Sequence, residues 1–193
     1  MKRVYLDTSL ILSPFRIQDP NYSLMKIIKK QNHLQFVTST LSIIEIFNIL
    51  LREKETFKLA LNKLLTNNDL IELSFLSKNL QIRLAIEFLL DYYNIHILSD
   101  DKPEFEKFRS IQIKIHPIFK LLISFTISSR LRTLDLLHYC HAKYFTEYKD
   151  FSINYVVTAD HLFQSGREVL KSDSITLLLS PETFIDLECQ KNQ

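Results

Sequence analysis

Short apolar segments that alternate with helix-like segments constrain the fold of this chain more than any other feature. The apolar segments are rich in β-branched and aromatic residues and show no regular alternation of polar and apolar positions. They cover residues 3–7, 35–39, 94–98, 153–158 and 174–180. Strands of this kind are typical of a parallel sheet that is buried on both faces and connected by right-handed helical crossovers. We therefore predict an α/β fold in which helices cover both faces of a central parallel sheet.

Helices are predicted between these strands, because apolar residues recur there at spacings of three and four. Pro103 and Pro117 each suit the opening of a helix. The predicted helices cover a short segment that ends near Pro14 and residues 21–30, 40–54, most of 56–95, 103–112, 117–129, 133–147 and 160–170. No repeat, low-complexity stretch or linker divides the chain, so residues 1–193 are expected to form one domain.

Glycine and cysteine usage excludes several classes of protein. The only glycine among the 193 residues is Gly166. A P-loop or a G-x-G-x-x-G turn needs several residues without a Cβ near the phosphate, so ATPases and dinucleotide enzymes of those types are excluded. Cys140 and Cys189 lie far apart and form no C-x-x-C pair, so neither a zinc site nor a disulfide framework is expected.

A cytoplasmic location with no membrane contact is expected. The cysteine usage fits a reducing compartment. The longest apolar runs are about half of the roughly 20 residues that a membrane-spanning helix needs. Asp7 interrupts the first apolar run, and no cleavage site follows, which argues against a signal peptide. The net charge of +2 is uninformative about nucleic acid, since only local clusters of Lys and Arg form a phosphate-binding face.

Four acidic residues lie among apolar neighbours at equivalent places in this pattern. Asp7 ends the first predicted strand, and Asp160 directly follows the strand at 153–158. Glu45 and Asp135 lie in the first turns of predicted helices. In parallel α/β folds the carboxyl ends of the strands and the amino ends of the following helices meet at one edge, where ligands bind. The four carboxylates are therefore expected to converge.

Each acid also has a purely structural interpretation. Asp7 and Asp160 suit helix N-caps, Asp135 suits the positive first turn of a helix, and Ser42 with Glu45 matches the S-x-x-E capping box. The apolar flanks of all four favour a site over these alternatives. Two carboxylates about 4 Å apart repel by about 4 kcal/mol at an effective dielectric constant near 20, so such a cluster needs cations or protonation.

Oxygen ligands without cysteine suit hard ions, and Mg²⁺ or Mn²⁺ binds a few carboxylates together with water and substrate phosphate. Such ions activate a water molecule and offset charge on a transferring phosphate. The four acids therefore point to hydrolysis of a phosphodiester.

The sequence resembles the PIN-domain ribonuclease family from its first strand to its last. The segments that carry the resemblance are "VYLDTSLIL", "TSTLSIIEIFNIL", "LRTLDLLHYCHAKYF" and "YVVTADHLF". The resemblance implies a three-layer α/β/α fold and Mg²⁺- or Mn²⁺-dependent endonucleolytic cleavage of RNA that leaves a 5′-phosphate and a 3′-hydroxyl. It assigns metal binding and catalysis to four acids and a supporting role to two hydroxyls. These residues are Asp7, Glu45, Asp135 and Asp160, with Ser9 and Thr158 in support. The two hydroxyls are equally well explained as ordinary helix-start and turn hydroxyls.

Short prokaryotic members of this family are VapC-type toxins, usually homodimers inhibited by a small antitoxin protein. The resemblance therefore implies an RNA substrate, an antitoxin partner and a homodimer. The segment of about 54–130 is longer than a minimal toxin needs, which implies additional helices beside the site. An RNA-processing nuclease without an antitoxin, and a PIN-like binding module with little catalysis, stay open as alternatives.

Histidine and basic residues near the acids have weaker functional signals. His138 and His141 form H-x-x-H, which lacks the glutamate of a metalloprotease motif, so His138 is interpreted as a packing residue that hydrogen-bonds near the site.

The basic residues Arg130, Arg132, Lys26, Lys29 and Lys30 are either contacts for RNA phosphates or, for the lysines above all, a solvated helix face. A phosphatase of the haloacid dehalogenase type is disfavoured, because its D-x-D-x-T motif is replaced by "DTSLI".

Overall fold

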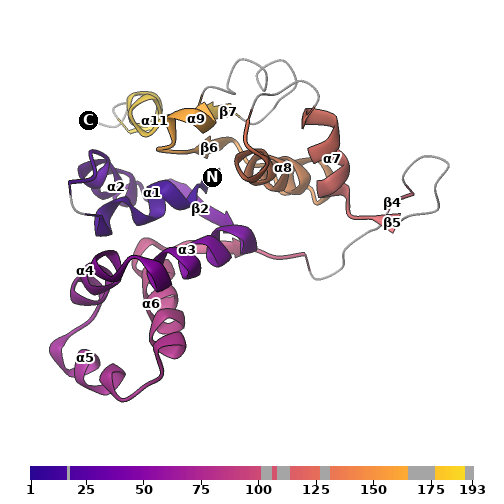
Figure 1. The fold of residues 1–193 in the computed structure, drawn as a ribbon. Coiled ribbons are helices and arrows are strands. Elements are labelled where there is room, and N and C mark those ends of the chain that lie inside the picture. The colour runs from indigo at the N-terminus through magenta and orange to yellow at the C-terminus, as the bar shows by residue number, and fades with distance from the viewer. Residues whose placement is uncertain (17, 101–105, 108–113, 127–130, 165–176, 190–193) are drawn as a thin grey trace.

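The fold is that of a computed structural model. It describes residues 1–193 except 17, 101–105, 108–113, 127–130, 165–176 and 190–193 (Figure 1).

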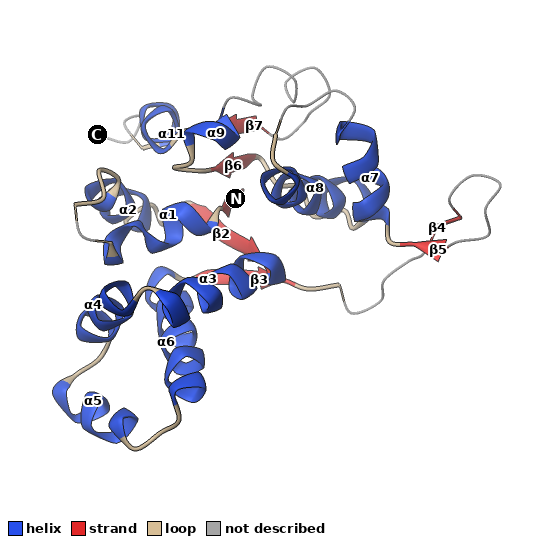
Figure 2. Ribbon diagram, in the orientation of Figure 1, coloured by secondary structure: helices blue, strands red, loops and turns tan. Residues whose placement is uncertain are grey.

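A five-stranded sheet forms the centre of the molecule (Figure 2). Its strand order is β3-β2-β1-β6-β7, and every neighbouring pair is parallel. The strands are β1 (Lys2–Leu6), β2 (Leu34–Ser39), β3 (Ile95–Leu98), β6 (Tyr155–Val157) and β7 (Leu177–Leu179). Val4 at the centre pairs with Phe36 on one side and Tyr155 on the other. All five predicted strands are present, and the parallel sheet is confirmed.

Helices cover both faces of the sheet, because successive residues of each strand point to opposite sides. Val4 and Leu6 pack into one apolar core, whereas Tyr5 packs into a second core on the other face. The first core is covered by α1 (Thr8–Leu12), the 3₁₀ helix η1 (Ser13–Phe15), α2 (Tyr22–Lys29), α3 (Thr40–Arg52), α4 (Lys54–Leu64), α6 (Lys78–Tyr93) and α11 (Pro181–Glu188). The second is covered by α7 (Pro117–Thr126), α8 (Thr133–Tyr148) and α9 (His161–Gln164). The predicted three-layer α/β/α class is confirmed.

One predicted helix differs from the structure, and one observed helix was not predicted. Glu106–Lys107, expected within a helix over 103–112, forms strand β4, which pairs antiparallel with β5 (Lys114–Ile115). The rest of that predicted helix lies outside the described residues, as do the ends of the helices predicted to reach 129 and 170. Helix α11 was not predicted, although Ser180 caps it by accepting a hydrogen bond from the Thr183 N–H and Pro181 opens it.

The long segment over 54–130 is more than a helical addition. It contains α4, α5 (Asn67–Ser74) and α6, but it also supplies β3, the edge strand of the central sheet, and α7, which packs on α8. Figure 1 shows α4, α5 and α6 together below the sheet, with α5 farthest from it. The segment therefore contributes to all three layers.

Three described residues other than glycine adopt a left-handed backbone conformation: Gln18, Asn94 and Asp150. Asn94 has a φ of 49° and ends α6, where it turns the chain directly into β3. Asparagine tolerates this conformation better than most residues with a Cβ.

No helix in the described part of the chain has the combination of length and hydrophobicity needed to cross a membrane.

Candidate active site

One pocket of about 290 Å³ at the carboxyl edge of the sheet is lined by all four predicted acids. Asp7 and Asp160 come from the segments that follow β1 and β6, whereas Glu45 comes from α3 and Asp135 from α8. The expected convergence of these side chains is therefore seen. None of the described residues between 54 and 130 lines this pocket, although α4 and α6 both pack on α3, the helix that carries Glu45.

Asp7 is held by two hydroxyl groups, one from α1 and one from the residue that follows β6. Its Oδ2 accepts hydrogen bonds from Ser9 Oγ at 2.6 Å and from Thr158 Oγ1 at 2.8 Å. Thr158 and Ser9 in turn accept the backbone N–H groups of Asp160 and Ala159, at 3.0 and 3.1 Å. Because β1 and β6 are adjacent in the sheet, this network fixes the Asp7 carboxylate against the loop that carries Asp160.

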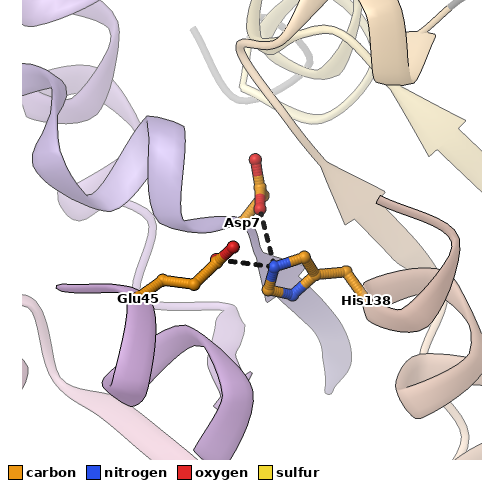
Figure 3. Close-up of side chains that lie close together, drawn as sticks. All are labelled: Asp7, Glu45 and His138. Carbon is orange, nitrogen blue, oxygen red and sulfur yellow. Dashed lines mark hydrogen bonds and ion pairs between the residues drawn. The ribbon is translucent and has the colours of Figure 1, made fainter. Parts of the chain in front are cut away.

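Glu45 and Asp7 meet at a third side chain, His138 of α8 (Figure 3). His138 Nε2 lies 2.7 Å from Glu45 Oε2 and 3.6 Å from Asp7 Oδ1. Thr8 Oγ1 also donates to Glu45 Oε2, at 2.6 Å. On its other side, His138 Nδ1 lies 2.9 Å from the buried hydroxyl of Tyr5. The imidazole is thus oriented from both ring nitrogens.

Asp135 and Asp160 are joined by Arg132. The guanidinium binds Asp135 through two contacts, Nε to Oδ2 at 2.8 Å and Nη2 to Oδ1 at 3.2 Å. Its Nη2 also lies 2.5 Å from Asp160 Oδ2. The pocket is therefore divided into two parts, one centred on His138 and the other on Arg132.

The local environment shifts the pKa values of these groups in different directions. Burial disfavours a charged His138, but Tyr5, Glu45 and Asp7 outweigh it and raise the pKa of His138 well above 6.5. Burial also opposes ionisation of Glu45, yet the hydrogen bond from His138 lowers its pKa. The pKa of Asp135 is raised because its burial outweighs the contact with Arg132.

For Asp160 the balance is reversed, since backbone N–H groups and Arg132 outweigh burial and lower its pKa. The cluster is therefore partly neutralised from within, by Arg132 and a protonated His138.

The capping interpretations apply to one acid in full. Asp160 Oδ1 accepts the backbone N–H groups of Leu162 and Phe163, as an N-cap does. Asp7 precedes α1, but its side chain makes no cap hydrogen bond. The Ser42–Glu45 capping box is wrong, because α3 begins at Thr40 and Ser42 Oγ lies 3.3 Å from Tyr5 Oη instead.

The donor set fits a divalent ion. The ligands in this set are carboxylate oxygens of Asp7 and Glu45, which lie within 4.8 Å of each other, with a ring nitrogen of His138 within the same distance of both. Among the contacts of the described residues, Glu45 Oε1 accepts no hydrogen bond, although the side chain is only 18% exposed. A half-buried carboxylate oxygen without a donor is a suitable ligand for a hard cation.

The roles of two residues in the site, His138 and Arg132, were underestimated from the sequence. His138 was expected only to pack and hydrogen-bond near the site, and Arg132 was expected only as a contact for RNA phosphates. Their spacing was visible in the sequence, because Arg132 lies three residues before Asp135 and His138 lies three residues after it. Residues three apart share a helix face. Arg130 lies outside the described residues.

The family of the chain agrees with this fold and site. A family model described as PIN domain matches residues 4–165, which is most of the chain. The chain therefore belongs to the PIN-domain family. PIN domains are generally nucleases that use divalent metal ions. No curated protein matches the chain significantly.

Proposed function

We propose that this protein is a metal-dependent endoribonuclease that cleaves RNA phosphodiesters at the pocket formed by Asp7, Glu45, Asp135 and Asp160. The observation that carries this proposal is the meeting of four acids from four separate segments in one pocket of a PIN domain. Their mutual repulsion is not fully offset by Arg132 and His138, which favours a further cation in the pocket.

Mg²⁺ or Mn²⁺ would be held by the four carboxylates, with Asp7 and Glu45 as the ligands closest to each other and His138 beside them. When bound, such an ion lowers the pKa of its water and stabilises charge on the scissile phosphate. The remaining steps belong to side chains of the protein.

Ser9 and Thr158 orient the Asp7 carboxylate, so that its other oxygen faces the pocket. Glu45 is ionised at neutral pH, and its Oε1 is available to accept a hydrogen bond from an attacking water. Arg132, whose side chain is 56% exposed, can move from the carboxylates to a phosphate oxygen of RNA when a metal ion replaces its charge.

The test is cleavage of defined transfer, ribosomal and messenger RNAs with Mg²⁺, with Mn²⁺ and with a chelator. Asp7→Asn and Asp135→Asn should each lower the cleavage rate by at least about a thousandfold, which corresponds to about 4 kcal/mol of barrier. Asp91→Asn on the exposed face of α6 removes the same charge outside the pocket and should cleave normally. Equal cleavage by the wild type and both pocket variants would reject the proposal. RNA binding without cleavage in either metal would favour a binding module.

We further propose that the protein acts in the cytoplasm as a homodimeric VapC-type toxin restrained by a small antitoxin. Expression without the partner should then arrest growth, and Asp7→Asn should relieve the arrest. Sedimentation of the purified protein tests the dimer. Growth that is unaffected by expression, together with no small reading frame beside the gene, would indicate an RNA-processing nuclease instead.

A further inference from the structure

A second pocket, of about 250 Å³, lies beside η1 and is basic. Pro14 and Phe15 of η1 line it, and helices α2, α4 and α6 surround it. Figure 1 shows these helices on one side of the molecule. The pocket is lined by three lysines, Lys26, Lys29 and Lys63, and by three tyrosines, Tyr22, Tyr92 and Tyr93.

The three lysines form no ion pair with a carboxylate of any described residue, and no acid lines the pocket. Four lysines elsewhere are paired with acids: Lys2, Lys58, Lys143 and Lys149 each lie within 3.2 Å of an acidic oxygen. Lys63 instead donates to the Pro14 carbonyl. Three ammonium groups gathered without a carboxylate repel one another, and an anion would relieve that repulsion.

Aromatic rings lie under these ammonium groups. Lys29 Nζ lies 3.1 Å from the centre of the Tyr92 ring, and Lys26 and Lys63 lie 4.6 and 4.5 Å from that of Tyr22. Lys26 and Lys63 also lower the pKa of the Tyr22 hydroxyl. Tyr22 and Tyr92 are 36% and 49% exposed, so both rings present surface to a ligand. Cations that follow a phosphate backbone beside accessible aromatic rings are typical of single-strand nucleic-acid sites.

The basic pocket is connected to the acidic pocket through η1. Pro14 and Phe15 line the basic pocket, whereas the next residue, Arg16, lines the acidic one. Arg16 is half-buried and lies 3.5 Å from Glu53. An RNA strand that leaves the acids therefore passes Arg16 before it reaches the lysines.

We propose that the pocket of Lys26, Lys29 and Lys63 binds phosphates of a single-stranded segment of the RNA substrate, with a base on Tyr22 or Tyr92, and so positions the strand for the acids. This inference rests on the proposed function, because it assigns a second contact for the same substrate.

The experiment measures binding separately from cleavage. Fluorescence anisotropy of a fluorescein-labelled octauridylate is recorded with the full-length protein in a chelator, over a range of salt concentrations. The test variant is Lys26→Gln/Lys29→Gln/Lys63→Gln. The control variant, Lys30→Gln/Lys54→Gln/Lys58→Gln, removes three charges outside the pocket, one from the residue that follows α2 and two from α4. All six lysines are exposed, and thermal unfolding verifies the fold of each variant.

The test variant should bind at least about tenfold more weakly in 0.1 M salt, and its slope of log K against log salt should fall by about 2, since each phosphate contact on a single strand contributes about 0.7. Tyr22→Leu and Tyr92→Leu test stacking. At least one of them should weaken binding by about fivefold or more with the slope unchanged. The control variant should bind like the wild type.

Equal binding by the test and control variants would overturn the inference, as would wild-type binding no tighter than that of inorganic phosphate or of double-stranded DNA. Failure of the proposed function has a different signature. In that case the wild type binds RNA through the lysines in the chelator, yet cleaves nothing with Mg²⁺ or Mn²⁺.

Discussion

His138 compensates for the crowding of Asp7 and Glu45, whose carboxylates approach each other at the end of β1. Its ring is 2% exposed and makes close contacts through both nitrogens, with Glu45 on one side and Tyr5 on the other. A buried imidazole normally loses its proton more easily, but here its pKa is raised. Its positive charge therefore stabilises two acids that would otherwise repel each other.

Replacing His138 by glutamine removes this charge and retains hydrogen-bonding capacity. In a chelator, His138→Gln should lower the free energy of unfolding by about 1–3 kcal/mol, the range for hydrogen bonds to charged groups. Mg²⁺ should then stabilise the variant more than the wild type, because the ion offsets carboxylate charge that no imidazolium offsets. Thermal unfolding with and without MgCl₂ measures both effects. His33→Gln, at an exposed position, is the control, and an equal Mg²⁺ effect in all three proteins would contradict the prediction.

Helix α8 is the element that brings the two halves of the site together. Asp135 and His138 lie one turn apart on it, and Arg132 immediately precedes it. The next turn carries His141, whose situation is the opposite of that of His138. Burial, together with the charges of His138 and His116, lowers the pKa of His141 from 6.5 to about 4. Near neutral pH, His138 is therefore protonated and His141 is neutral, although they lie three residues apart on one helix.

His141 should make the protein sensitive to mild acid. Between pH 6.5 and 4 the unfolded chain binds a proton at this position and the folded chain does not, so stability falls as the pH falls. The loss is at most about 3 kcal/mol. His138 acts in the opposite direction above about pH 6.5, where only the folded state holds its proton, and it adds little slope well below that pH, where both states are protonated.

Urea unfolding at several pH values from 7.5 to about 4.5 tests this prediction. His141→Gln should reduce the decrease in stability, whereas His33→Gln should not. The same decrease in the wild type and in His141→Gln would show that His141 is not responsible.

At the scale of the whole molecule, the folded unit extends beyond the family match at residue 165. Strand β7 pairs with β6, and α11 packs on α2. The first strand and the last helix are also joined directly. Glu188 Oε1 accepts hydrogen bonds from Lys2 Nζ at 2.6 Å and from the Tyr155 hydroxyl at 2.5 Å.

A chain that ends at residue 165 should not fold stably. It loses the buried side chains of Leu178, Leu179, Phe184 and Ile185. At about 1.5–3 kcal/mol for each buried apolar side chain, the loss is of the order of 6–12 kcal/mol. That is comparable with the whole stability of a typical domain, about 5–15 kcal/mol.

Circular dichroism and urea unfolding of the truncated and full-length proteins measure this loss. The full-length Glu188→Gln variant serves as the comparison, since it removes the ionic contact with Lys2 and retains β7 and α11. A truncated chain that unfolds at the same urea concentration as the full-length protein would show that the last strand and helix are dispensable.

Local patterns were sufficient to predict much of this architecture. The strands at 3–7 and 35–39 were predicted because burial on both faces leaves a continuous apolar run. The helix at 133–147 was predicted because burial of one face leaves apolar residues at spacings of three and four. Strand β4 and helix α11 were not, since two residues are too few for a periodicity and "PETFIDLE" carries charges among its apolar residues.

The sequence by itself determined the layer order and the placement of Asp7, Glu45, Asp135 and Asp160 at one edge of the sheet, because strand ends and helix starts are local properties of the chain. Only the tertiary structure decided which cations accompany them. Glu45 and His138 are 93 residues apart, and Arg132 and Asp160 are 28 apart. The packing of α3 and α8 on opposite faces of the sheet brings these partners into contact, and no periodicity in the sequence encodes those contacts.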